Sequence, residues 1–383
     1  MLFNSYIFIL FFLPLCVAMY FFLYHLRMGK AARLWLLGMS LWFYGYFNPS
    51  YVLIICGSIA VNFIISQFLL RQRRLGRRRT AAAGMAAGVC LNIALLFYFK
   101  YFDFFLENIN AVFHTDFALR NIVLPLGISF FTFQQISYVV DSYRGETAGY
   151  SLLDYAVFVS FFPQLVAGPI VLHDELIPQL REEERHRPDA EYLARGLYLF
   201  AAGLFKKVIV ADTLGNLVAL GFGGLEILTT IDVLLVIFAF ALQLYFDFSG
   251  YSDMAVGIAS MFHIALPMNF NSPYKARSIL EFWDRWHMTL TRFLRRYIYF
   301  PLGGSRKGRL RTYGNILIVF LVSGFWHGAN WTFVVWGALH GAALCVHKMF
   351  VRTDRKGSAA RNILYAAATD IFVCLCWIFF RAD

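Results

Sequence analysis

FNSYIFILFFLPLCVAMYFFLY, residues 3–24, contains no Asp, Glu, Lys or Arg. A helix needs about 20 mostly apolar residues to cross the hydrocarbon core of a bilayer, and this segment is long enough. It is too long for the apolar region of a cleavable signal, and no basic residue precedes it. We therefore expect residues 3–24 to form a first membrane-spanning helix.

Apolar segments of this kind recur along the whole chain of 383 residues. Hydrophobic residues make up 60 % of the sequence and charged residues only 15 %, whereas about a quarter of the residues of an average soluble domain are charged. This composition excludes a soluble globular protein, a disordered chain and a small secreted disulfide scaffold. Further candidate spans are residues 34–47, 51–70, 81–99, 122–140, 152–171, 192–210, 233–248, 313–326, 333–346 and 364–380.

Several of these segments contain Pro or paired Gly residues, which interrupt helices. Examples are Pro125, Pro163, the pair Gly168-Pro169 and residues 221–224. At membrane depth an interrupted helix is tolerated only against protein or a water-filled cavity. The sequence therefore predicts an all-α polytopic membrane protein. We expect about ten transmembrane or re-entrant helices around an interior passage, in a single domain over residues 1–383.

The net charge of +11 comes from basic residues that gather between the apolar segments. Two short loops, residues 25–33 and 71–79, are especially basic, and loops of this kind lie in the cytoplasm. Two spans separate them, so both can be cytoplasmic, which places the N-terminus outside. In a soluble protein this charge would suggest nucleic acid. Here it indicates contact with membrane lipid, and we expect no nucleic-acid partner.

The six cysteines all lie inside apolar segments, where Cys behaves as a small hydrophobic residue. Cys374 and Cys376 are two positions apart and would face different sides of a helix. We therefore expect neither a disulfide framework nor a metal site. Residues 174–191 are polar and of mixed charge, and we expect a surface loop or an interfacial helix there.

Ionisable residues within membrane segments are costly, which makes each of them a candidate functional residue. Asp247 and Asp253 lie at the end of a strongly apolar segment, beside the hydroxyl side chains of Ser249, Tyr251 and Ser252. Paired carboxylates could relay protons. They could instead be structural, accepting backbone N–H bonds at a polar helix break or pairing with a distant Arg.

A second candidate is His287, in the segment EFWDRWHMTLTRFLRR, residues 281–296. The spacing predicts a basic amphipathic helix at the inner membrane interface. Its apolar stripe comprises Trp286, Leu290, Phe293 and Tyr297, and its polar stripe comprises Arg285, Thr289, Arg292 and Arg296. His287 lies on neither stripe, and Asp284, three residues earlier, could orient its imidazole. The alternative is an interfacial His that anchors lipid headgroups.

A third candidate is His327, in SGFWHGANW, residues 323–331. The small neighbour Gly328 would let a substrate or a second backbone come close. A neutral imidazole can take a proton from a hydroxyl nucleophile and return it to a leaving group. His340 lies in a second Trp–Gly–His–Gly setting and could support it. The alternative is a structural His that bonds a neighbouring helix.

These motifs together resemble the membrane-bound O-acyltransferase (MBOAT) family, and most of all its bacterial alginate O-acetyltransferase branch. The resemblance covers nearly the whole chain in the expected order. It is carried by QLYFDFSGYSDMA (243–255), EFWDRWHMTLTRFLRRYIYFPLGG (281–304) and SGFWHGANWTFVVWGALHG (323–341), supported by LPLGISFFTFQQISYVVDSYRG (124–145) and FFPQLVAGPI (161–170).

The resemblance implies a reaction and the residues that perform it. The family's His in Trp-His-Gly matches His327, which would be the general base or acyl-handling residue. Its His in Arg-Trp-His matches His287, which would assist, and the two would lie close together inside the helix bundle. On this comparison Asp247 and Asp253 are structural. The resemblance also implies further membrane helix after Asp383, so that this member is either short or truncated.

The resemblance further implies an acyl group, acetyl in this branch, that passes from a cytoplasmic thioester through the bacterial inner membrane. The acceptors would be hydroxyls of an exported polysaccharide such as alginate, reached with a periplasmic acetyltransferase partner protein. The donor, acetyl-CoA or an acyl carrier, is a co-substrate, and no permanently bound cofactor is expected. A cytoplasmic entrance would be basic, formed by residues 285–296 with Arg306, Lys307, Arg309 and Arg311, which could bind donor phosphates or anionic lipid.

Three alternatives stay open on the sequence. Within the family, the chain could transfer D-alanine to teichoic acid or acetyl groups to peptidoglycan. Outside it, the chain could be a transporter without acyl chemistry, although transporters commonly show repeated halves and this sequence shows no repeat. Simple alternation of spans also places His327 toward the outer end of its helix, so a central position requires a re-entrant or tilted segment.

Overall fold

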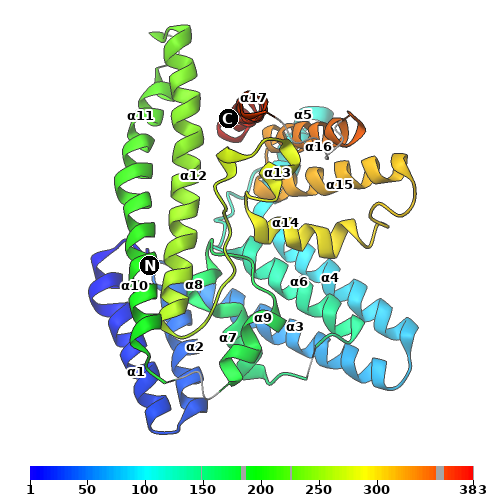
Figure 1. The fold of residues 1–383 in the computed structure, drawn as a ribbon. Helices are drawn as coiled ribbons and strands as arrows, with labels where there is room; N and C mark the ends of the chain where they lie inside the picture. The colour runs from blue at the N-terminus through cyan, green and yellow to red at the C-terminus, as the bar shows by residue number, and fades with distance from the viewer. Residues whose placement is uncertain (148, 183–186, 225–226, 351–357, 383) are drawn as a thin grey trace. The chain divides into compact units, whose positions relative to one another are not determined.

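The computed structural model describes residues 1–382 except 148, 183–186, 225–226 and 351–357. Within these residues the chain forms helices joined by turns and irregular segments, with no strand (Figure 1). The prediction of an all-α protein is confirmed. Long apolar runs explain the result, because a helix satisfies its backbone hydrogen bonds within its own segment.

Six described helical segments are long and apolar enough to cross a membrane. They are η1 with α1 (Phe8–His25), α3 (Ser50–Arg74), α4 (Arg78–Lys100), α12 (Thr230–Met261), α16 (Trp331–Phe350) and α17 (Ala359–Arg381). The chain is therefore a multi-pass membrane protein. Other predicted spans correspond to shorter helices, such as α2 (Gly29–Gly45) and α6 (Ile128–Arg144), which have 17 residues each.

Two predicted spans differ in the structure. Residues 152–171 do not form one helix, because α7 (Leu152–Ser160) ends at Phe161 and the short α8 (Phe162–Leu165) follows, with Pro163 in its first turn. The span expected at 122–140 begins only at Ile128. Gly127 adopts a φ of +73°, and a Cβ there would lie 2.5 Å from the carbonyl oxygen of Leu165. Close backbone contact therefore sets this helix start.

The polar segment 174–191, expected to form a surface loop or an interfacial helix, is partly buried in the structure. Helix α9 (His173–Arg181) buries Leu176, Ile177 and Leu180 along one face. Residues 183–186 of this segment lie outside the described residues. The apolar spacing within a charged segment explains why α9 packs into the protein.

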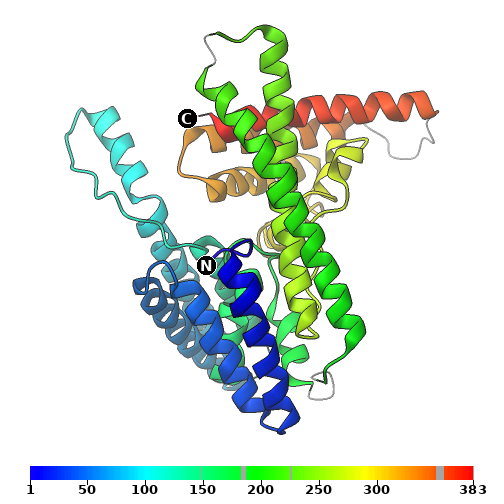
Figure 2. The ribbon, with the colours of Figure 1, turned by 90° about the vertical axis from the view of Figure 1, so that its left-hand side faces the viewer.

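The described chain divides into two compact units. Unit 1 comprises Met1–Leu204 and Tyr251–Pro267, and unit 2 comprises Phe205–Gly250 and Met268–Asp383. Within unit 2, α11 (Asp212–Gly223) lies beside the first part of α12 (Figure 2). A Cβ on Gly221 would lie 2.3 Å from the side chain of Val236, so glycine permits this close approach.

Unit 1 contains a buried ion-pair cluster on α7. Asp154 accepts hydrogen bonds from Arg33 Nη1 at 2.7 Å and from Arg181 Nη2 at 2.7 Å. Burial by itself would raise the pKa of Asp154, but hydrogen bonds from Ser151 and Arg181 hold this pKa below its usual value of 3.8. The Asp154 carboxylate therefore stabilises the folded state at every pH at which it is ionised.

We expect Asp154→Asn to destabilise unit 1 by about 2 kcal/mol at neutral pH, because the charge-assisted hydrogen bonds from half-buried Arg33 and exposed Arg181 lose their anionic acceptor. Because the pKa of Asp154 is lower in the folded than in the unfolded protein, the ionised carboxylate stabilises the fold at a pH above its unfolded-state pKa. This stabilisation is lost as the pH falls through the folded-state pKa. The thermal unfolding midpoints of wild type and variant should therefore converge below pH 3.8. The exposed Asp116→Asn is the matched control, and equal midpoints for Asp154→Asn and wild type at pH 7 would contradict the prediction.

Candidate functional site

The site begins with a tight hairpin between α15 (Arg309–His327) and α16. A Cβ on Gly324 would lie 2.2 Å from the carbonyl oxygen of Phe333, and one on Gly337 would lie 2.4 Å from that of Phe320. Side chains cannot be accommodated at these distances, so the two backbones touch through glycine. His327 is the last residue of α15. The glycine contact therefore fixes the position of the His327 backbone relative to α16.

His327 is half-buried among aromatic rings. Its imidazole lies with ring centroids 5.0 Å from Trp336 of α16 and 5.1 Å from Phe380 of α17. Both neighbours present an edge or a face to the imidazole at steep angles. Partial exposure distinguishes His327 from the two other histidines of this region, because His287 and His340 are buried.

His287 lies in a sharp turn between α13 (Ile279–Trp283) and α14 (Met288–Leu294). Its φ of +44° and ψ of +52° are left-handed, which is uncommon for a residue other than glycine. The prediction of one continuous amphipathic helix over 281–296 is therefore wrong. The predicted stripes do not run through the turn, although Leu290 and Phe293 are both buried on α14.

Asn269 explains this turn. Its backbone oxygen accepts from Met288 N at 3.0 Å, and its side-chain Oδ1 accepts from Thr289 Oγ1 at 2.9 Å and from Thr289 N at 3.3 Å. These bonds satisfy donors at the start of α14 that no residue of the helix itself could reach. A long-range cap thus replaces the continuous helix that the local sequence favours.

The same amide oxygen sets the tautomer of His287. Nδ1 of His287 lies 3.0 Å from Asn269 Oδ1. Because a backbone N–H also donates to this atom, it is the acceptor oxygen of the amide, and Nδ1 must carry the proton. The lone pair of His287 is then on Nε2. Burial lowers the pKa of His287 to about 3, so the ring is neutral and Nε2 can accept a hydrogen bond.

Asp284 does not orient His287, contrary to the prediction. Its side chain is exposed and lies 3.5 Å from Arg295 Nη2. The helix break explains the error, because residues three apart share a face only where the helix is continuous. The orienting residue is Asn269, which sequence reasoning missed. It is 18 positions away in the chain, and no local pattern indicates it.

The indole of Trp326 brings the two predicted histidines together. Its ring centroid lies 5.0 Å from that of His327 and 6.3 Å from that of His287. The ring of Phe248 lies nearly perpendicular to the His287 ring, with 4.8 Å between the centroids. The end of α15 and the α13–α14 turn therefore contribute one imidazole each to the surroundings of a single side chain.

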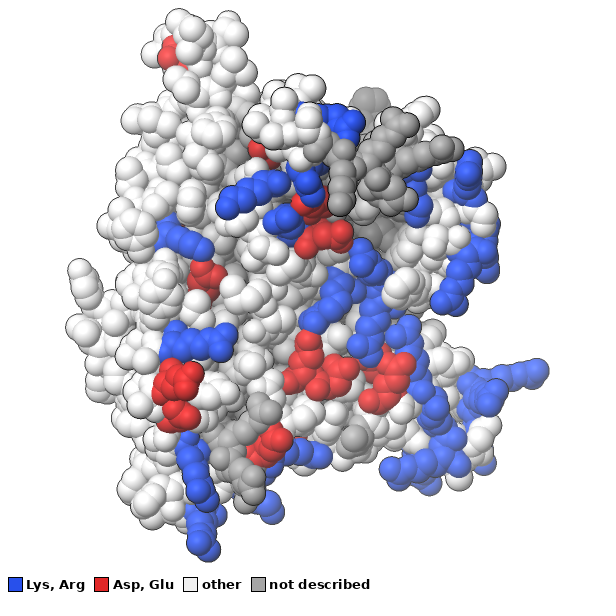
Figure 3. All heavy atoms as spheres, viewed as in Figure 1, with Lys and Arg blue, Asp and Glu red and all other residues white. Residues whose placement is uncertain are grey.

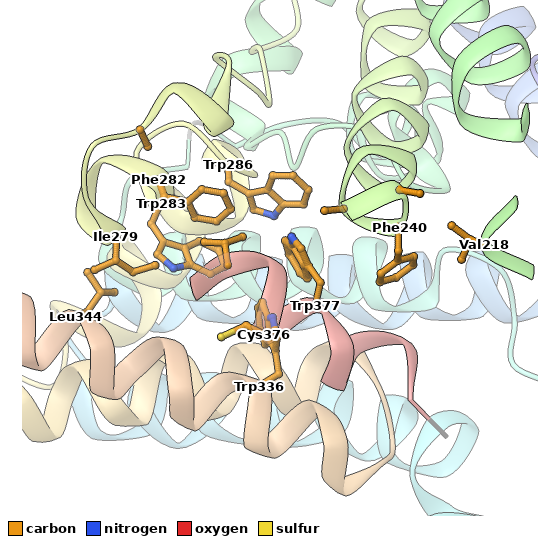
Figure 4. Close-up of a cluster of buried hydrophobic side chains, with 14 residues drawn as sticks. Val218, Phe240, Ile279, Phe282, Trp283, Trp286, Trp336, Leu344, Cys376 and Trp377 are labelled. Atoms are coloured by element: carbon orange, nitrogen blue, oxygen red, sulfur yellow. The ribbon is translucent and has the colours of Figure 1, made fainter. Parts of the chain in front are cut away.

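His340 forms the far side of this aromatic region. Its Nδ1 accepts a hydrogen bond from Trp283 Nε1 at 3.2 Å, so its own proton is on Nε2. Among the described residues, neither Nε2 of His340 nor Nε1 of Trp336 has a hydrogen-bond partner. Trp283, Trp336 and Trp377 lie in the same buried apolar cluster (Figure 4). Two buried N–H groups of this cluster are thus unsatisfied in the described structure.

A cavity of about 630 Å³ opens within unit 2 next to this region. It reaches Ser323, one helical turn before His327, and Trp283, which holds His340. The remaining wall is largely apolar, with Asp284, Arg295, His347 and Lys348 as its acidic and basic residues, while His287, His327 and His340 do not line it. A volume of this size suits a small organic ligand with one charged end.

The two aspartates of the 245–253 segment lie on a continuous helix. Residues 230–261 form α12 without interruption, so the polar helix break considered for this segment does not exist. Asp247 Oδ1 lies 2.8 Å from Lys207 Nζ, which also contacts Asp212 at 2.7 Å. A lysine shared by two carboxylates favours a structural role for Asp247. The described residues contain no group of three or more His, Cys, Asp or Glu that could hold a metal ion.

Comparison with known proteins agrees with the resemblance. The model of the MBOAT, membrane-bound O-acyltransferase family, matches residues 89–381. The chain is 42 % identical to the peptidoglycan O-acetyltransferase of Helicobacter pylori, with all of this chain and 77 % of that protein covered. It is 39 % identical to a Pseudomonas aeruginosa protein described as "Probable alginate O-acetylase AlgI", with all of this chain and 72 % of that protein covered.

A more distant relative shares the same family. The teichoic acid D-alanyltransferase of Bacillus subtilis is 26 % identical, with 82 % of each chain covered. The family match includes His287 and His327 together with the cavity beside them. The predicted enzyme class is thereby confirmed, and the chain belongs to the membrane-bound O-acyltransferase family.

Proposed function

We propose that this O-acyltransferase moves acetyl groups from a cytoplasmic thioester through the bacterial inner membrane to hydroxyls of an exported polysaccharide. The observation that carries the proposal is the placement of half-buried His327 and neutral His287 around Trp326. The similarity to two O-acetyltransferases over the full chain supports acetyl as the transferred group. The basic loops 25–33 and 71–79 would be cytoplasmic and the N-terminus outside.

The proposed chemistry needs one base and one hydrogen-bond donor. His327 takes the proton from the acceptor hydroxyl, whose oxygen attacks the thioester carbonyl carbon. The C–S bond then breaks, and the thiolate leaves with the proton returned by the imidazolium. Nε2 of His287 assists by accepting a hydrogen bond from the hydroxyl or from an intervening water. The buried N–H of Trp336 stabilises negative charge on the carbonyl oxygen.

The cavity of unit 2 supports the entry of a thioester donor. Its apolar wall suits an acyl chain and a thioester arm, while Arg295 and Lys348 suit phosphate groups. Arg295 belongs to the basic segment expected at the cytoplasmic entrance. Arg285 of the same segment is paired with Glu281 at 2.9 Å. In this proposal the donor is a co-substrate, acetyl-CoA or an acyl carrier.

The acceptor is an exported glycan. A periplasmic acetyltransferase partner protein completes the transfer to it. Alginate and peptidoglycan are the polymers named for the two relatives at 39 % and 42 % identity. We propose alginate-type acetylation first, and peptidoglycan acetylation is the second candidate, supported by the 42 % identity to the Helicobacter pylori protein.

The proposal predicts that inverted membrane vesicles containing the chain and its partner transfer label from radiolabelled acetyl-CoA to a polysaccharide. Alginate oligomers and peptidoglycan glycan strands are supplied in parallel, and label is scored on protein and polymer. Vesicles without the chain are the control. Label transferred only from a D-alanyl carrier would favour D-alanylation, and solute movement without any acyl transfer would overturn the enzymatic proposal.

A further inference from the structure

A second cavity, of about 450 Å³, lies in unit 1 where α3 ends, α4 begins and α6 ends. Three of its six lining residues are arginines and none is acidic. We call it the arginine pocket. It is lined by Arg73, Gly76, Arg78, Ala81, Tyr143 and Arg144. The mechanism proposed above does not use it.

Arg73 is exposed, but its guanidinium is held by a hydrogen bond and by packing. Its Nη1 donates to the carbonyl oxygen of Tyr143 at 2.8 Å. The guanidinium also packs over Gly145, where a Cβ would lie 2.4 Å from Arg73 Cζ. A glycine at a φ of +78° is therefore required for this placement. A fixed guanidinium loses less conformational entropy when it binds a ligand than a free one.

The start of α4 makes an anion favourable here. A helix N-terminus carries a partial positive charge and is normally met by acidic or capping side chains. In α4 the first turn contains no acid, and Arg77 provides no side-chain cap. Arg78 and Arg79 add further positive charge at this end. The pocket thus brings three guanidinium groups and the positive end of a helix to one place, which favours an anionic ligand.

The nearby surface carries many basic side chains and a few acidic ones. Lys and Arg side chains gather over the α3–α4 hairpin (Figure 3). The carboxylate of Asp141 lies 3.6 Å from Arg144, but this residue is fully buried, contacts His173 at 3.3 Å and does not line the pocket. Exposed Glu146 is not among the lining residues either.

The pocket lies at the ends of two candidate membrane spans. Ser50–Arg74 and Arg78–Lys100 both meet the length and composition of a transmembrane helix. The short connection between them therefore leaves the bilayer at the depth of the lipid headgroups. A cavity of this volume at that depth can hold a headgroup while the acyl chains stay in the membrane.

We propose that the arginine pocket binds the phosphate group of an anionic phospholipid. Arg73 and Arg78 donate charge-assisted hydrogen bonds to the phosphate oxygens from α3 and α4, and Arg144 does so from α6. Binding would fasten three helices of unit 1 together at one membrane surface. The site is distinct from the His287 and His327 region of unit 2 in both residues and chemistry.

The test compares two pairs of substitutions that remove the same charge from the same loop. R73Q/R78Q alters the pocket, whereas R74Q/R79Q alters the neighbouring positions, which do not line it. The full chain is placed in nanodiscs of phosphatidylcholine with a minor fraction of phosphatidylglycerol, and retained lipid is counted by native mass spectrometry. We expect R73Q/R78Q to lower the retention of phosphatidylglycerol roughly 30-fold, about fivefold for each arginine, and R74Q/R79Q to lower it less than twofold.

Equal losses in both variants would overturn the proposal, because they would indicate diffuse surface attraction. R78Q alone keeps the bond between Arg73 and Tyr143, so it separates lost binding from local misfolding; an unchanged retention in R78Q would count against the site. Inorganic phosphate and a short-chain phosphatidylglycerol are compared as stabilisers in detergent. Stabilisation by inorganic phosphate alone, sensitive to R78Q, would replace the lipid by a soluble phosphate and overturn the lipid assignment.

Discussion

His327→Ala should lower acyl transfer to the polysaccharide by about 10⁴-fold, the upper end of what general acid–base catalysis contributes. His327 is the half-buried imidazole of the site, and its neighbours Trp336 and Phe380 carry no group that could replace a base. The measurement is label transferred from the thioester donor to polymer in membrane vesicles. Removing the imidazole leaves donor binding largely intact, so the loss should fall on the rate at saturating donor.

The control for this variant is His114→Gln, which changes an exposed histidine of unit 1. Membrane insertion and thermal stability are measured for both variants. The glycine contact that positions α15 against α16 does not involve the His327 side chain, so His327→Ala should insert and fold normally. Retained transfer in a correctly inserted His327→Ala protein would remove His327 from the mechanism.

His287→Gln should lower the transfer rate by about 10²- to 10³-fold, less than His327→Ala, because His287 assists rather than replaces the main base. With its pKa lowered to about 3, His287 stays neutral at every pH at which the enzyme works. The rate should therefore show no acidic limb from His287 between pH 5 and pH 9. The measurement is the pH profile of transfer in wild type and variant.

Asn269→Asp tests the hydrogen bond that orients His287. A carboxylate 3.0 Å from Nδ1 stabilises the imidazolium and raises the pKa of His287. A protonated ring cannot accept a proton, so transfer should fall as the pH decreases through this raised pKa and recover above it. A uniform loss at all pH values would indicate that Asn269 only stabilises the turn.

The hydropathy pattern predicted most of the helical architecture, because apolar runs of about 20 residues leave few alternatives in a bilayer. It failed where distant residues decide the local structure. The turn at His287 depends on Asn269, which is 18 positions away. Periodicity describes neighbours along a helix and carries no information about such contacts. The break between α7 and α8, in contrast, lies beside Pro163, which the sequence indicated as an interruption.

The candidate site was predicted only in part from the residues themselves. Spacing identified His287 and His327 as candidates among several histidines, while the family resemblance implied that they lie close together. The structure places both beside Trp326. Asn269 and Trp283, which fix the proton positions of His287 and His340, carry no sequence signal because their partners are remote in the chain.

In unit 2 the buried histidines His287 and His340 are partnered by an amide and an indole rather than by carboxylates. Neither group titrates between acid and alkali, so the imidazole orientations persist across the whole range in which the protein is folded. Neither carries a formal charge, so neither brings the Born cost of an ion placed in a low-dielectric interior. These two imidazoles are therefore oriented by uncharged dipoles, which places no formal charge beside them in the apolar interior of unit 2.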